Sequence, residues 1–128
     1  MKKLLVALML LVPAVWAHHS MAGFDRTQSK SLTGVVKDFA WQNPHAWIEL
    51  EVTADGKTVV WNFEMTAPAY LVRAGWKKNT IKPGDKVTVT GNPLKTGEPG
   101  ALFVSVTLPD GTKMGERAAP PAGKAAAK

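Results

Sequence analysis

The chain has 128 residues, a formal net charge of +6 and no cysteine. This length suffices for one compact domain, and the composition excludes disulfides and thiolate metal ligands. The basic residues do not form the clustered stripe that is typical of nucleic-acid-binding proteins, so no nucleic acid is expected as a partner.

The first seventeen residues are predicted to be a signal peptide that is cleaved on export. Two lysines precede a short apolar run at 4–12, and Val15 and Ala17 are small residues at the positions that a signal peptidase reads. The apolar run is too short to span a bilayer comfortably. No transmembrane segment is therefore expected in the mature protein.

Cleavage after Ala17 would make His18 the first residue of the mature protein. We favour this position over the alternative after Ala22, because it is nearer to the end of the apolar run. The free α-amino group and the imidazole of His18 could then bind one metal ion together. Cleavage after Ala22 would remove both His18 and His19.

The mature chain is predicted to consist of an N-terminal arm at 18–30, one domain at 31–115 and a disordered tail at 116–128. The tail is mostly Ala, Pro, Gly and Lys, which cannot bury enough apolar area to become ordered.

Three strands are expected before residue 66. The first covers 31–40, with a bulge or bend at Gly34. The second covers 45–52, where apolar and polar residues alternate. The return strand covers 58–65, and the Asp55-Gly56 pair between the two strands is typical of a hairpin turn.

The pattern changes after residue 65. Thr66 is expected to cap a short helix near 68–74 that ends at Gly75. Two further strands are expected, at 86–91 and 101–108. The side chains predicted to be buried in the core are Ile48, Leu50, Trp61, Phe63, Val87, Val89, Val104 and Val106.

Five antiparallel strands, with one helix between the third and the fourth, predict a small OB-fold-like β-barrel. A β-sandwich with a similar strand count is the alternative, but it would not need the helix. A barrel closes its own edges, which suits a monomer without disulfides.

Seven short motifs are spread over the mature chain. They are Ala17-His18-His19-Ser20, Phe24-Asp25, Gly34-Val35-Val36, Asn43-Pro44-His45-Ala46-Trp47-Ile48, Gly75-Trp76, Lys82-Pro83-Gly84-Asp85 and Phe103-Val104-Ser105-Val106. Together they resemble a family of small exported bacterial proteins of unknown function. The resemblance covers nearly the whole mature chain except the tail. It implies a periplasmic location in a Gram-negative cell, and it implies no activity.

The candidate metal ligands are His18, His19 and His45, the three histidines of the chain. An N-terminal amine and two imidazoles would form the T-shaped arrangement called a histidine brace, and such nitrogen ligands favour Cu(II). These residues predict a periplasmic metal-binding protein with copper as its cofactor. In the alternative interpretation, His18 and His19 lie in a frayed N-terminus and His45 forms a hydrogen bond to a loop.

A second candidate site is a surface formed by Trp41, Trp47, Glu49 and Glu64. Exposed aromatic rings on an OB-fold can stack against sugars or bases, and both glutamates are expected on outward strand faces. This pattern favours a metal-free module of the cell envelope that binds a small ligand or an envelope protein. A copper-dependent oxidative enzyme is the remaining alternative. No phosphate loop, nucleophile elbow, zincin helix or haem motif is found, so no catalytic residue is predicted.

Overall fold

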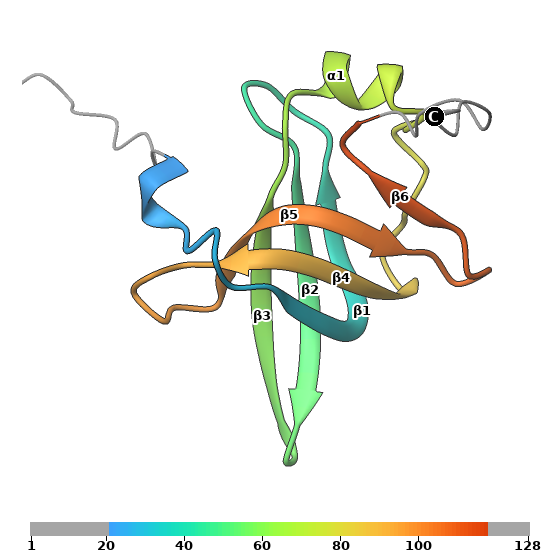
Figure 1. Cartoon of the computed structure of the whole chain (residues 1–128). Helices are drawn as coiled ribbons and strands as arrows, with labels where there is room; N and C mark the ends of the chain where they lie inside the picture. The colour runs from blue at the N-terminus through green and yellow to red at the C-terminus, as the bar shows by residue number, and fades with distance from the viewer. Residues whose placement is uncertain (1–20, 118–128) are drawn as a thin grey trace, which may run out of the picture.

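The chain folds into one strongly curved sheet that closes on itself. The computed structural model describes residues 21–117, and α1 covers one end of the barrel (Figure 1). The elements are a 3₁₀ helix at Met21–Gly23, β1 at Lys30–Ala40, β2 at Trp47–Ala54, β3 at Lys57–Glu64, α1 at Pro68–Arg73, β4 at Lys86–Pro93, β5 at Gly100–Thr107 and β6 at Lys113–Gly115.

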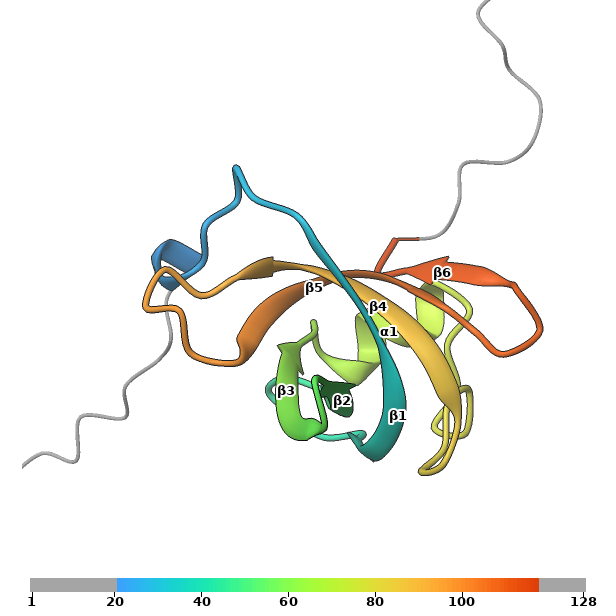
Figure 2. The same cartoon turned by 90° about the horizontal axis from the view of Figure 1, so that it is seen from below.

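The barrel has five strands with α1 between β3 and β4, as the sequence predicts. The strand order is β3-β2-β1-β4-β5, and β3 also pairs with β5. This closing pair is parallel, whereas the sequence analysis expected only antiparallel pairs. The reason is the odd number of strands, because strands that alternate in direction around a ring of five must include one parallel pair. Viewed from below, α1 lies at the far end of the barrel (Figure 2).

A bulge in β5 changes which of its side chains face the core. Thr90 pairs with Ser105 and the next residue, Gly91, pairs with Phe103, so Val104 is an extra residue in the ladder. Such a bulge reverses the alternation of faces. Val104 is therefore exposed rather than buried as predicted. Trp61 in β3, also predicted to be in the core, is only partly buried and packs against the edge of the core cluster. The other predicted core residues are buried, namely Ile48, Leu50, Phe63, Val87, Val89 and Val106.

Helix α1 begins at Pro68, so its N-cap is Ala67 and not Thr66, the residue expected from the sequence. Ala67 occupies the N-cap position in an extended conformation and has no side-chain oxygen for a capping bond, so the predicted Thr66 cap is wrong. A residue before proline is disfavoured in the helical region, which fixes the helix start at Pro68. Gly75 follows the helix with φ of 91°, the left-handed conformation expected at a helix end.

The N-terminal segment packs against the end of β4. The Phe24 side chain is buried and Phe24 forms an isolated bridge with Leu94. The Asp25 N–H donates to the Pro93 carbonyl over 2.8 Å. In Figure 1 the 3₁₀ helix accordingly lies beside the β4–β5 loop. Phe24 thus fixes this part of the chain at one side of the barrel.

The short strand β6 pairs with β5 and adds a contact near α1. The indole N–H of Trp76 donates to the Gly115 carbonyl over 2.8 Å, and the Trp76 ring is buried edge-on against Phe103. β6 was not predicted from the sequence. Neither of the helices within residues 21–117 is long and apolar enough to cross a membrane.

Candidate functional site

His45 lies in the β1–β2 loop with one ring nitrogen fixed by the backbone. Its Nδ1 is 2.7 Å from the Met65 carbonyl oxygen. A carbonyl oxygen can only accept, so Nδ1 carries the proton and Nε2 keeps its lone pair in the neutral ring. Two backbone bonds between Ala46 and the 65–66 segment extend the β2–β3 ladder, place Ala46 opposite Met65 and so bring the neighbouring His45 ring to the Met65 carbonyl.

Glu64, the last residue of β3, is the carboxylate closest to this ring. Its Oε1 lies 3.8 Å from Nε2 of His45, and its side chain is 9% exposed. The expectation of an outward, solvated glutamate is therefore wrong, because the His45 loop and the C-terminal segment both approach this face. Among the described residues, no hydrogen-bond partner reaches Oε2 of Glu64. A buried acceptor without a donor is costly, which points to a ligand.

Glu116 completes a group of three titratable side chains. Its Oε1 accepts the backbone N–H of Thr66 over 2.6 Å. Burial raises the pKa of Glu116, and the charge of Glu64 adds to that rise, whereas the Thr66 bond and the charges of His45 and Arg117 oppose it. From the sequence, Glu116 is expected to be the first residue of a disordered tail, whereas its side chain is bonded to Thr66.

These side chains line a pocket of about 450 Å³. Arg26 reaches it from the N-terminal segment and Arg117 from the C-terminal one, and six separate parts of the chain contribute to its wall. The pocket thus combines an imidazole, two carboxyl groups and two guanidinium groups. The imidazole and the carboxyl groups are possible metal donors, whereas the two guanidinium groups favour an anionic group.

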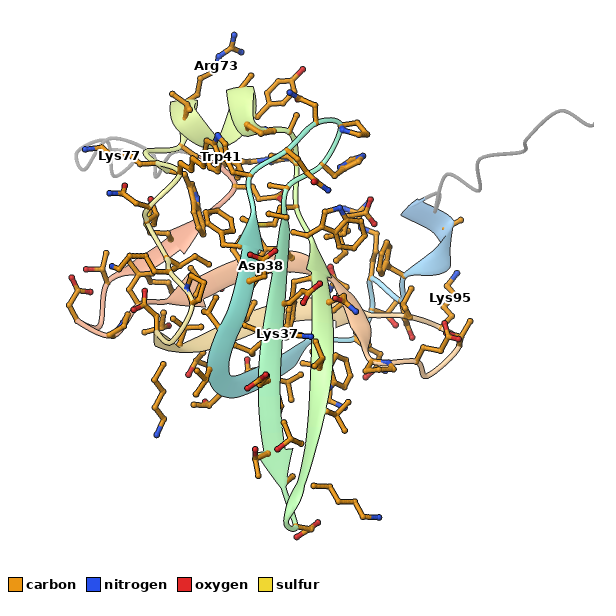
Figure 3. All side chains as sticks on the ribbon, turned by 180° about the vertical axis from the view of Figure 1, so that it is seen from behind. Lys37, Asp38, Trp41, Arg73, Lys77 and Lys95 are labelled. Carbon is orange, nitrogen blue, oxygen red and sulfur yellow. The ribbon has the colours of Figure 1, made fainter. Side chains whose placement is uncertain are left out.

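Three residues of the predicted ligand-binding surface, Trp47, Glu49 and Glu64, lie on one face of the β2–β3 pair, whereas Trp41 lies in the β1–β2 loop. Trp47 and Glu64 are direct partners across β2 and β3. Trp41 packs edge-on against Phe39 at a ring distance of 5.7 Å. Glu49 forms a surface ion pair of 3.7 Å with Lys37. Figure 3 places Trp41 near α1 and Lys37 farther along the strands.

Residues 7–103 of the chain match the model of a family of unknown function, DUF6152. The chain belongs to the DUF6152 family. No curated protein and no solved structure matches it significantly. The DUF6152 match includes His45 and Glu64, and it ends before Glu116.

Two of the predicted metal ligands of this DUF6152 chain, His18 and His19, lie outside the described residues. Within residues 21–117, no group of three or more His, Cys, Asp or Glu side chains is placed to hold a metal ion. The described part of the chain therefore offers a pair of donors, Nε2 of His45 and the Glu64 carboxylate. Any further ligand must come from elsewhere.

Replacing Glu116 with glutamine is expected to change how stability depends on pH. A raised pKa in the folded state means that folding favours the protonated carboxyl, so the wild type loses stability as the pH rises through that pKa. Glutamine keeps an oxygen for the Thr66 N–H and carries no charge. Glu116→Gln should therefore gain stability relative to wild type between about pH 4 and pH 7. Urea unfolding midpoints of both proteins across this pH range measure the difference. If the midpoints of Glu116→Gln and wild type change with pH in parallel, the prediction is contradicted.

Proposed function

We propose that this protein is an exported metal-binding protein that holds Cu(II) between His45 and its mature N-terminus. In this proposal His18 supplies its amine and imidazole, and His19 lies beside it as a further ligand. The observation that carries the proposal is the fixed tautomer of His45. Metal-binding histidines usually donate their other ring N–H to a carbonyl or a carboxylate, and His45 does so to Met65.

The distance between His45 and Glu64 supports the same proposal. Two donor atoms that bind one first-row metal ion at about 2 Å each lie at most about 4 Å apart. Nε2 of His45 and Oε1 of Glu64 are 3.8 Å apart. One ion could therefore contact both atoms with little movement of either side chain, and the carboxylate would offset part of its charge.

The position of the N-terminal segment supports a ligand from that end of the chain. Phe24 is anchored beside β4, and Arg26 lines the same pocket as His45. His18 precedes the 3₁₀ helix at Met21–Gly23 by three residues, which span at most about 11 Å when extended. In this proposal the short arm turns back toward the pocket that Arg26 shares with His45.

Copper follows from the chemistry of the donors. Amine and imidazole nitrogens bind Cu(II) more tightly than other divalent first-row ions, and the chain has no thiolate to compete. We further propose a periplasmic monomer whose partner is the metal ion. No residue is assigned a catalytic role.

Adding one glycine before His18 is expected to weaken Cu(II) binding at least tenfold. Changes to groups that only orient a metal ligand already lower metal affinity about 10–100-fold. The extension displaces the α-amino group from the imidazole of His18 and leaves all side chains in place. Competitive Cu(II) titration of the two forms measures the difference, after intact mass has established each N-terminus.

Protein recovered from the periplasm should begin at His18. A mature protein that begins at Gly23 would lack two of the three proposed histidines and would contradict the proposal. Affinity should also fall on acidification, because protons compete with the metal for the imidazole and amine nitrogens.

A further inference from the structure

A second pocket, of about 500 Å³, is also lined by Glu64, but its other lining residues differ from those of the first pocket. It is formed where the N-terminal segment and the β4–β5 loop meet the ends of β2 and β3. The backbone around it is well fixed, because Asn62 N–H donates to the Pro99 carbonyl and Leu94 N–H donates to the Gly100 carbonyl. Its volume lies in the range of small-molecule sites.

The wall of this pocket is largely apolar and aromatic. Phe24, Trp47, Leu94, Pro99 and Ala101 contribute to it. Phe24 and Ala101 are buried, whereas Trp47 is partly exposed. Such a wall suits a ligand with a flat apolar body, which could stack against the Trp47 indole.

The charged side chains that line this pocket are all acidic. Glu64 and Glu98 line it, and no Lys, Arg or His among the described residues does. The nearly buried Glu64 carries the oxygen Oε2, which has no hydrogen-bond partner in the described part of the chain. A cationic donor would satisfy this oxygen, and aromatic faces also attract cations.

We propose that this second pocket binds a small organic amine, with its ammonium group on Glu64 and its apolar body against Trp47. The two pockets share Glu64, but only the first is lined by His45 and Glu116 and only the second by Phe24 and Trp47. The proposal therefore does not depend on copper binding.

Three probes of similar shape and different charge test this proposal. Phenethylamine, phenethyl alcohol and phenylpropionate are titrated calorimetrically into the mature protein with a chelator present. Phenethylamine should bind at least about tenfold more tightly than the neutral alcohol, since hydrogen bonds to charged groups are the stronger ones. Phenylpropionate should bind most weakly. Amide shifts at Gly100 and Ala101 should locate the bound amine. Equal binding of the three probes, or no binding, would overturn the proposal.

Two isosteric variants separate a specific contact from a general charge effect. Glu64→Gln should lower phenethylamine affinity about tenfold or more, whereas Glu98→Gln, at an exposed position of the same pocket, should lower it less than about threefold. Equal losses in both variants would contradict the assignment to Glu64. The probe series on wild type remains decisive if Glu64→Gln does not fold. The protein with one glycine added before His18 leaves Glu64 and its neighbours unchanged and should retain amine binding, so failure of the amine site and failure of the copper site are distinguishable.

Discussion

Replacing His45 with alanine is expected to lower Cu(II) affinity by about a hundredfold or more. Changes to residues that merely orient a metal ligand cost 10–100-fold, and here the proposed ligand itself is removed. The His45 side chain is 47% exposed, so its loss leaves no large cavity in the core. Competitive titration with a chelator of known affinity measures the change.

Gln42→Ala is the matched control for this experiment. Gln42 lies in the same loop as His45, is exposed, and does not line the pocket. It should bind Cu(II) as wild type does. If His45→Ala also binds as wild type does, the histidines are not the ligands, and the metal-free binding module becomes the better explanation of the fold.

The barrel could be predicted because its signals are local. The alternation around Ile48 and Leu50 marks a half-buried strand, and the Asp55-Gly56 pair adopts positive φ at both residues, as a tight hairpin requires. The burial of Phe24, in contrast, depends on its pairing with Leu94, seventy residues further along the chain.

The candidate site was harder to predict because long-range contacts create it. Alternation places Glu64 on the outward face of β3, and that assignment is correct for the strand by itself. Glu64 is nevertheless buried, because the loop of His45 and the segment of Glu116 approach the same face. Glu116 contacts Thr66 across fifty residues of sequence. No local pattern encodes such a contact.

The exposed Val104 illustrates a second reason why the sequence does not predict every feature of the fold. Its sequence alternates as an ordinary strand does, and the extra residue is visible only in the pairing with Thr90 and Gly91. A bulge depends on the partner strand as much as on the strand itself. The same holds for β6, which is three residues long and exists through its pairing with β5.

Replacing Gly34 with alanine is expected to destabilise the fold by about 3 kcal/mol or more, at or beyond the upper end of ordinary overpacking. A Cβ at this position would lie 2.2 Å from the backbone oxygen of Glu51 and 3.0 Å from Cγ of Leu50. Gly34 pairs with Val87 of β4 while its neighbour Val35 pairs with Glu51 of β2. The backbone therefore cannot move away from one strand without disturbing the ladder to the other.

Gly23→Ala provides the control, because a Cβ there meets no atom within 4 Å. It should change stability by less than about 0.5 kcal/mol. Denaturant midpoints at unchanged m-value measure both variants. A loss of several kcal/mol is a large part of the stability of a small domain. Gly34→Ala should therefore also disorder the loop of His45, which follows β1. Equal denaturation midpoints for the two variants would contradict this prediction, because they would mean that β1 and β2 can separate at Gly34 without cost. The barrel would then not hold His45 against Met65 as rigidly as the proposed metal site requires.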